Sequence, residues 1–209
     1  MVIKSVDKIP KRKKKCIYPF KVETSSNTVL RKATVASCFL IVTELLEPMG
    51  KNKIPSTNAL RALRSAKVEF EIHRYPYEEG GGTARSAQEL GVDEYNVVKT
   101  LVMECDANKP LIILMHGDHE VSTKTLARHL GVKSIQPCKP EIALKHSGYL
   151  VGGTSPFGTK KKMPIYVEHS ILELATIYIN CGQRGLLVSL APSVLLSLLK
   201  ASPVRVARS

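Results

Sequence analysis

The chain has 209 residues, of which 44% are hydrophobic, and this is enough to bury one substantial core. Its 31 lysines and arginines outnumber 18 acidic residues and give a net charge of +13, which favours a polyanionic partner. Nucleic acid is the expected partner, with an acidic membrane surface as the alternative. The five cysteines form no C-x-x-C pair, which argues against a disulfide framework and indicates reduced thiols in a cytoplasmic protein.

Residues 1–54 have no periodic pattern. They contain a basic block at 10–15 and an apolar run over 33–46, which includes Glu44 and is shorter than the roughly 20 residues of a membrane helix. We therefore expect a basic, poorly patterned extension and no membrane span. An organellar targeting segment and a phosphate-binding arm stay open as alternatives.

A folded domain is predicted after this extension. The stretch STNALRALRSAKV starts with an N-cap residue, Ser56 or Thr57, and places leucines on one face of a short helix. In residues 68–75 apolar and polar side chains alternate, which predicts a half-buried strand. Three glycines, Gly80–Gly82, interrupt the chain before a second helix that Gly91 can end.

Further helices and strands alternate along the rest of the chain. Two apolar runs, Val97–Cys105 and Pro110–His116, are joined by a polar turn and predict neighbouring strands. Beyond them we expect helices over 122–131, 140–148 and 192–200, and strands over 133–136, 163–168, 176–180 and 185–190. Because the last strands leave no room for helical crossovers, the pattern predicts an α/β fold with a mixed sheet. The domain is expected to span 55–201, with a basic tail at 202–209.

The segment YLVGGTSPFGTKKKMP, residues 149–164, places three glycines beside three lysines. Gly152 and Gly153 allow close approach of a ligand, while the Ser-Pro pair and Gly158 introduce bends. Such a loop can direct backbone N–H groups at a carboxylate, carbonyl or phosphate oxygen. The Walker pattern G-x-x-x-x-G-K-[ST] is absent. A ligand-binding loop and a structural turn beside solvated lysines both fit.

Lys99 lies in a strand that should be largely buried. A buried ammonium needs partners or a lowered pKa, which makes Lys99 a site candidate; a lysine reaching the surface from an edge strand is the alternative. The stretch His116–Glu120, HGDHE, lacks the order of a zinc motif, so we expect a surface turn and no metal or other cofactor. No nucleophile motif is recognisable in the sequence.

Several stretches together resemble the YbaK-type aminoacyl-tRNA deacylases, which are related to the editing domain of bacterial prolyl-tRNA synthetase. They include SAQELGV, VVKTLVME, SGYLVGGTSPFGTKKKMP and TIYINCGQRGLLVSLAP, and the resemblance covers about residues 55–201. It implies a curved six- to seven-stranded mixed sheet with short flanking helices around a small pocket. It also implies removal of a wrongly attached amino acid from tRNA, most often cysteine from tRNA(Pro), and possible action on Cys-tRNA(Cys).

The resemblance also assigns residues to the site. Lys99 is expected near the terminal adenosine and the scissile ester, with Gly152, Gly153 and Ser155 as the other catalytic residues. The expected substrate-binding residues are Tyr75, Thr154, Pro156, Gly158 and Glu168, and the expected tRNA-binding residues are Lys160, Lys161 and Lys162. Glu168 stands where bacterial members usually carry aspartate, and the stretch MHGDHEVSTK departs from a more apolar family strand.

In cysteine-specific members the substrate's own thiol is expected to attack its ester carbonyl. Intramolecular attack can have an effective molarity on the order of 10⁵ M or more, so the protein mainly needs to orient and polarise the ester. Backbone N–H groups of residues 152–155 would stabilise the oxyanion. Mischarged tRNA(Pro) is the expected partner, with prolyl-tRNA synthetase as a candidate member of a ternary complex. A non-catalytic tRNA- or synthetase-binding module and a nucleotide-binding protein stay open.

Overall fold

The computed structural model describes residues 55–106 and 108–208, which belong to one unit, Lys53–Ser209. The expected extension at 1–54 lies outside the described residues. Within the described part of the chain, no helix is long and apolar enough to cross a membrane.

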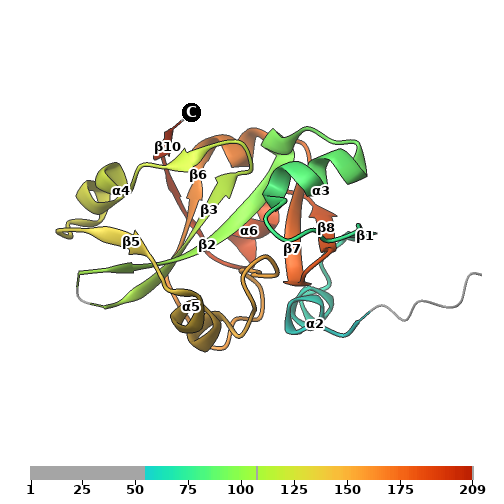
Figure 1. Cartoon of the computed structure of the whole chain (residues 1–209), viewed down its shortest axis with the longest axis horizontal. Coiled ribbons are helices and arrows are strands. Elements are labelled where there is room, and N and C mark those ends of the chain that lie inside the picture. Colours follow the sequence, from blue (N-terminus) through green and yellow to red (C-terminus); the bar gives the residue numbers. More distant parts are fainter. Residues whose placement is uncertain (1–54, 107, 209) are drawn as a thin grey trace, which may run out of the picture. The chain divides into compact units, whose positions relative to one another are not determined.

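One mixed sheet dominates the domain (Figure 1). Its strand order is β1-β8-β7-β2-β3-β6-β9, and β5 pairs separately with β2. The strands are β1 Glu71–Arg74, β2 Val97–Cys105, β3 Pro110–His116, β5 Ile135–Pro137, β6 Ile165–Glu168, β7 Ile177–Gln183, β8 Leu186–Leu190 and β9 Ser202–Val204; β4 Glu120–Val121 and β10 Ala207–Arg208 form a separate pair. The β2–β7, β3–β6 and β6–β9 pairs are parallel and the others are antiparallel. The prediction of a mixed sheet is confirmed.

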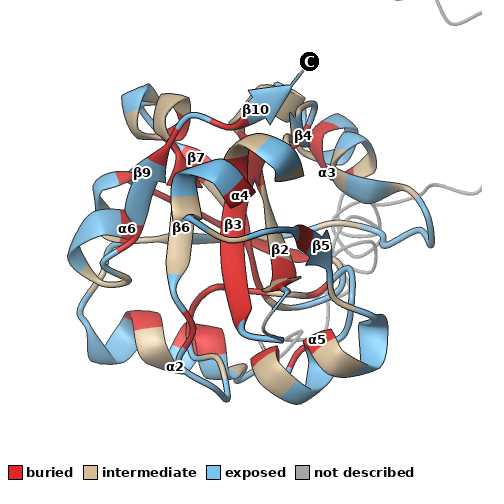
Figure 2. Ribbon diagram, turned by 90° about the vertical axis from the view of Figure 1, so that its left-hand side faces the viewer, coloured by how far each residue is buried: buried red, intermediate tan, exposed pale blue. Residues whose placement is uncertain are grey.

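The β2–β3 hairpin forms the middle of the sheet and is covered on both faces. All seven residues of β3 are buried, and Figure 2 shows this strand in the interior of the domain. Ile112 and Leu114 pack into one core cluster, whereas Ile113 and Met115 pack into a second one. A strand that is buried on both faces has a continuous run of apolar residues, and this pattern predicted β3 from the sequence.

Short helices cover the sheet. The helices are α2 Asn58–Ser65, α3 Gly82–Leu90, α4 Thr123–Leu130, α5 Pro140–Ser147 and α6 Ser193–Ser197, with 3-10 turns at η1 Glu94–Asn96 and η2 His169–Glu173. Their ends follow the predicted signals: the Thr57 hydroxyl accepts a hydrogen bond from the N–H of Leu60, and Gly91 and Gly131 end their helices in the left-handed conformation. α2, α5 and α6 contribute to one core cluster and α4 to the other.

The chain departs from the predicted boundaries at two places. The strand expected over 68–75 is confined to Glu71–Arg74, because the N–H of Val68 still bonds to the end of α2 through the carbonyl of Leu63. The segment 202–208 is not a separate tail. It supplies β9 and β10, and Val204 and Val206 are buried in the core, so the sheet has eight strands.

The expected surface turn at His116–Glu120 also needs correction. His116 is the last residue of β3 and is fully buried. Its Nδ1 lies 2.6 Å from the carbonyl oxygen of Tyr95, and its Nε2 lies 2.7 Å from the hydroxyl of Ser170. A carbonyl can only accept, so Nδ1 carries the proton and Nε2 accepts from Ser170. Burial lowers the pKa of His116, which fits this neutral, structural role.

Candidate functional site

One edge of β2 is bare over a short stretch in the middle of the sheet. β7 pairs with β2 only at Val97 and Val98, and β5 pairs with it only at residues 103–105. The N–H of Cys138 donates to the carbonyl of Val102 (3.0 Å), so the even-numbered residues here direct their backbone groups away from β3. By the same alternation, the N–H and C=O of Thr100 point into the gap between β5 and β7.

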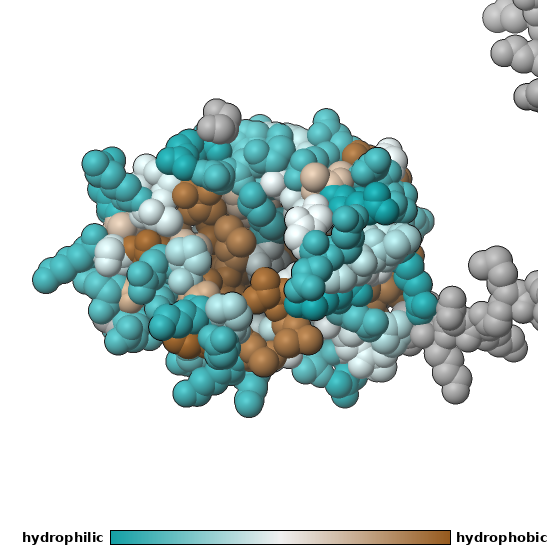
Figure 3. Space-filling model, viewed as in Figure 1, coloured by the Kyte–Doolittle hydropathy of each residue, from teal (hydrophilic) through white to brown (hydrophobic). Residues whose placement is uncertain are grey.

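A cavity of about 670 Å³ occupies this gap, and we call it the main cavity. Its lining residues come from β2, β7, β8, the segment after β1, and the glycine loop, which we define as residues 149–158. Figure 3 shows a hollow on this face of the molecule, bordered by hydrophobic side chains. Leu150 and Val151 of the glycine loop are 58% and 51% exposed. The volume and the apolar rim are typical of a site for a small organic ligand.

The glycine loop is held rigidly from both of its ends. The hydroxyl of Tyr149 donates to the carbonyl of Phe157 (2.7 Å), and both side chains are buried. Gly152 has φ +84°, and a Cβ at this position would lie 2.9 Å from the hydroxyl oxygen of Tyr77. A Cβ at Gly158 would lie 2.6 Å from the carbonyl oxygen of Asn58 in α2. The two glycines therefore permit contacts that any larger residue would block.

Asn180 of β7 positions the part of the loop that faces the main cavity. Its Nδ2 donates to the carbonyl of Gly152 (3.1 Å), and its Oδ1 accepts from the N–H of Gly182 (2.9 Å). The N–H of Gly153 donates to the carbonyl of Leu150 (2.9 Å) and is used up within the loop. The N–H groups of Gly152 and Thr154 have no partner among the described residues. Because both residues line the main cavity, these two groups are candidate donors to a ligand.

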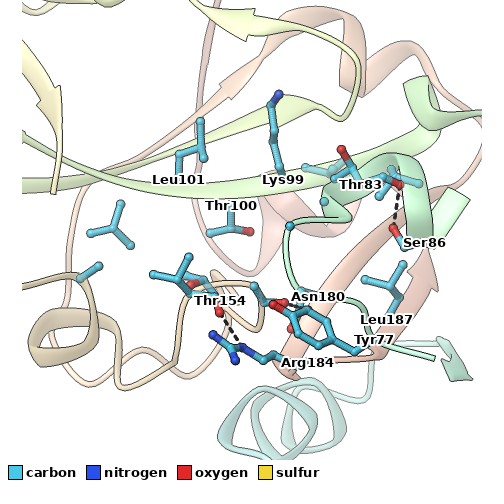
Figure 4. A pocket seen from close by; sticks show the side chains of 18 of the residues that line it. Tyr77, Thr83, Ser86, Lys99, Thr100, Leu101, Thr154, Asn180, Arg184 and Leu187 are labelled. Atoms are coloured by element: carbon cyan, nitrogen blue, oxygen red, sulfur yellow. Dashed lines mark hydrogen bonds between the residues drawn. The ribbon is translucent and has the colours of Figure 1, made fainter. Parts of the chain in front are cut away.

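Thr100 contributes a polar side chain to the same space. Its hydroxyl is buried and has no hydrogen-bond partner in the described part of the chain. Figure 4 shows the Thr100 side chain on the same side of β2 as Thr154 and Asn180. A buried hydroxyl without a partner costs about 1–3 kcal/mol, a cost that a ligand bonding to it would remove.

Lys99 points to the other side of β2. Figure 4 shows its side chain directed away from Thr154 and Arg184, although it still lines the main cavity. Its Nζ donates to the carbonyl of Gly117 (3.0 Å), which also accepts from the hydroxyl of Thr83 (3.2 Å). Burial lowers the pKa of Lys99, and nearby carboxylates, Glu94 first, partly oppose this effect. Lys99 is therefore a half-buried cation at one end of the cavity.

The cysteine in the lining is not an activated nucleophile. Cys138 is the cysteine that lines the main cavity, and burial, together with the carboxylate of Glu104, raises the pKa of its thiol to about 11. Such a thiol is protonated at neutral pH and unreactive. Among the described residues, no cluster of three or more His, Cys, Asp or Glu side chains could hold a metal ion.

The family model described as an aminoacyl-tRNA editing domain matches residues 78–198, which is more than half of the chain. This chain belongs to the aminoacyl-tRNA editing domain family. The match includes most of the lining of the main cavity, so the cavity lies in the part of the molecule that defines the family.

Three proteins similar to this editing domain have names that refer to tRNA or to its synthetases. It is 32% identical over 152 residues to EbsC of Enterococcus faecalis, a candidate Cys-tRNA(Pro)/Cys-tRNA(Cys) deacylase, covering 72% of this chain and 93% of that protein. It is 28% identical to part of the proline–tRNA ligase of Ligilactobacillus salivarius, covering 47% of this chain and 17% of the ligase. A solved structure of a candidate trans-editing enzyme for prolyl-tRNA synthetase shares the fold, with a TM-score of 0.65, 21% identity, and coverage of 75% of this chain and all of that one.

The editing domain brings four of the expected site residues together around the main cavity. These are Tyr75, Lys99, Gly152 and Thr154. Tyr75 is half-buried there, and burial raises the pKa of its hydroxyl. The catalytic roles of these residues stay predictions.

Other expected site residues of the loop lie behind the cavity. Ser155 is fully buried, and its Oγ accepts from the N–H of Phe157 (3.4 Å), so it shapes the turn. Gly153 packs against the backbone of residues 183–184, and Pro156 is buried. Gly158 contacts α2. Their contacts fix the shape of the loop, and their catalytic and substrate-binding roles stay predictions.

Glu168 and the three lysines also lie outside the cavity lining. Glu168 is 4% exposed, and its carboxylate accepts hydrogen bonds from the backbone of the C-terminal segment. Its assignment to the substrate pocket stays a prediction. Lys160, Lys161 and Lys162 are exposed. The N–H groups of Lys160 and Lys161 bond to the carbonyls of Ser147 and His146 at the end of α5, which directs this basic run along the surface.

Reasoning from the sequence missed several lining residues, namely Tyr77, Thr100, Asn180, Arg184 and Leu187. Arg184 lies over the ring of Tyr77, 5.1 Å from its centroid, and its Nε donates to the carbonyl of Val151 (2.9 Å). The stretch CGQRG, a tight turn between two apolar strands, was the signal available for Arg184. For Thr100 the signal was its place beside Lys99.

Proposed function

We propose that this protein is a trans-editing deacylase that removes cysteine from mischarged tRNA(Pro), with Cys-tRNA(Cys) as a further candidate substrate. The observation that carries the proposal is a cavity of the editing-domain family that contains polar donors and whose cysteine, Cys138, is not activated. A cysteinyl ester brings its own nucleophile, so this substrate fits a site that only orients and polarises. The name of the relative EbsC supports the same substrate class.

Cleavage of the ester needs no reagent besides the substrate, and water completes the hydrolysis. The substrate's thiol loses its proton and its sulfur attacks the ester carbonyl carbon, forming a C–S bond. The C–O bond to the ribose of the terminal adenosine then breaks, and the proton ends on the freed ribose hydroxyl. The product is a strained cyclic thioester of cysteine, which water opens to the free amino acid.

We propose a task for each of these groups in the reaction. The N–H groups of Gly152 and Thr154 would stabilise the oxyanion that develops on the ester carbonyl, since preorganised donors are most effective where charge appears. Thr100 would bind the substrate through its hydroxyl and its free backbone groups. Lys99, at the other end of the cavity, would orient the terminal adenosine.

Single-turnover deacylation tests the proposal directly. Cys-tRNA(Pro), Ala-tRNA(Pro) and Ser-tRNA are incubated with excess wild-type protein and with Lys99→Ala. We expect rapid loss of cysteine only, and much slower loss in the variant. Equal rates for cysteine and serine would exclude attack by the thiol, and no loss of any amino acid would favour a non-catalytic tRNA-binding module.

Two departures from the family pattern do not favour that module. Both Glu168 and the stretch around His116 lie outside the main cavity and have structural partners.

A ternary complex with prolyl-tRNA synthetase is proposed as the route to mischarged tRNA, because the domain is small. Sedimentation of the protein with synthetase, with and without tRNA(Pro), tests this step; a complex should form only when all three components are present.

A further inference from the structure

A ridge of two side chains separates the main cavity from a second cavity. Tyr77 is 38% exposed, and the guanidinium of Arg184 lies over its ring at 5.1 Å from the centroid. Two contacts hold this pair in place: Tyr77 packs against Gly152, and the Nε of Arg184 donates to the carbonyl of Val151 (2.9 Å). Figure 4 shows both side chains beside Thr154 at the edge of the main cavity.

The second cavity has a volume of about 380 Å³ and lies on the far side of this ridge. It shares Tyr75, Tyr77 and Arg184 with the main cavity, and its other lining residues are Pro55, Arg74, Gln183, Gly185 and Leu186. Two arginines and two tyrosines thus surround a space of a size that suits one nucleobase. No residue of this cavity was predicted as a site residue except Tyr75.

The charges on the ridge favour a nucleotide. Arg184 is exposed and forms no ion pair with a carboxylate within the described residues, so its terminal nitrogens can bind a ligand. Its guanidinium is already oriented by Tyr77 and Val151, which lowers the entropy lost on binding. A planar cation that lies over a tyrosine ring can offer its outer face to a base and its N–H groups to a phosphate. These are the two groups that each nucleotide of a single strand presents.

We propose that the second cavity binds the nucleotide preceding the terminal adenosine of the tRNA, with its base stacked on Arg184. This inference rests on the proposed function, because it assumes that the aminoacylated adenosine occupies the main cavity. The single-stranded 3′ end would then cross the ridge between the two cavities. The ridge recognises the RNA strand, whereas the main cavity recognises the amino acid.

The test uses stable analogues in which alanine is attached by an amide bond to 3′-amino-3′-deoxyadenosine. One analogue is this nucleoside alone, and the other carries one preceding cytidine phosphate. Calorimetric titration of the full chain gives the ratio of the two affinities. Stacking of one base predicts that the longer analogue binds roughly 5- to 100-fold more tightly to the wild type. The ratio, rather than either affinity, is compared among variants because Arg184 also lines the main cavity.

Arg184→Ala and Arg184→Lys should both reduce this ratio to about 1, since an ammonium cannot stack as a guanidinium does. Arg128→Ala, which removes an equally exposed arginine from α4 at the far end of the sheet, should leave it unchanged. A ratio near 1 in the wild type, or one that survives in either Arg184 variant, overturns the second site. The ridge would then be a candidate contact for a protein such as the synthetase.

The deacylation assay separates this inference from the proposed function. If the wild-type protein shows the expected affinity ratio but releases no amino acid from Cys-tRNA(Pro), the second site is supported and the proposed activity is excluded. If it deacylates Cys-tRNA(Pro) but binds both analogues equally, the proposed activity is supported and the second site is excluded.

Discussion

Glu168 and Val206, 38 positions apart in the sequence, are joined by a hydrogen bond of 2.7 Å from the backbone N–H of Val206 to Oε2 of the carboxylate. The same oxygen accepts from the N–H of Ala207 (2.8 Å), and Oε1 accepts from the N–H of His169 (3.1 Å). Val206 is buried. The carboxylate therefore fixes the C-terminal segment to the end of β6.

Glu168→Gln should reduce stability without changing catalysis. The amide has one oxygen in place of two and adds an N–H₂ group facing backbone donors, so we expect a loss of about 1–3 kcal/mol in the free energy of unfolding. This corresponds to a fall in Tm of roughly 3–10 °C. Thermal unfolding and single-turnover deacylation of the folded variant measure the two effects. Glu69→Gln, which changes an exposed carboxylate, is the control. A slower reaction of Glu168→Gln at unchanged Tm would indicate that Glu168 acts in the substrate site.

Thr100→Val should weaken substrate binding but not the fold. The valine removes a buried hydroxyl that has no partner among the described residues, so stability should be unchanged or about 1 kcal/mol higher. Affinity for the alanyl-adenosine analogue should fall about 2- to 10-fold, the value of one hydrogen bond. Thr100→Ser restores the hydroxyl and should restore the affinity. Full affinity in the valine variant would mean that the hydroxyl does not touch the ligand.

Asn180→Asp should slow the reaction by changing the position of Gly152. A carboxylate cannot donate to the carbonyl of Gly152, and the two oxygens would repel each other. We expect the single-turnover rate to fall at least 10-fold, as for loss of an oxyanion donor, with a smaller change in affinity. Asn58→Asp, on the exposed start of α2, should react normally. An equal loss of rate and affinity in Asn180→Asp would instead indicate general disorder of the loop.

Lys99 should make the stability depend on pH in a defined direction. Its pKa in the folded protein lies below the ordinary value of 10.5 because of burial. Between these two values the folded protein has lost the proton while the unfolded chain still holds it, so the free energy of unfolding rises with pH. Below the lowered pKa both states are protonated, and the buried ammonium destabilises the fold.

Urea denaturation of the wild type and of Lys99→Met at several pH values up to about 10.5 measures this contribution. The stability of the wild type relative to the variant should increase as the pH rises. Lys124→Met removes an exposed lysine and should show no such trend. A relative stability that falls with pH would mean that the ammonium is stabilised by its carboxylate neighbours.

Changing Lys160, Lys161 and Lys162 together to alanine should weaken binding of deacylated tRNA and reduce its dependence on salt. Removing one lysine–phosphate interaction lowers the slope of log affinity against log salt by about 0.7–0.9. Filter binding between about 50 and 300 mM salt measures this slope. An unchanged slope would show that these exposed lysines face away from the bound tRNA.

Local patterns in the sequence were sufficient for most helices and strands. The apolar runs at 97–105 and 110–116 match β2 and β3, because a strand covered on both faces must be apolar throughout. Gly91 and Gly131 end helices as expected, because only glycine adopts the left-handed conformation there without strain. The motif of the glycine loop indicated both the family and one wall of the site.

The fold class and the family were thus predictable from the amino-acid order alone, since they depend on short-range periodicity and on motifs. Which side chains meet depended on the folded arrangement. Pairing of β2 with β7 and β5 leaves the edge at Thr100 bare, and Arg184 reaches Tyr77 from a different part of the chain. Glu168 and the C-terminal segment are likewise joined across 38 positions. Such contacts depend on strand order and register, which are set by packing of the whole core rather than by neighbouring residues.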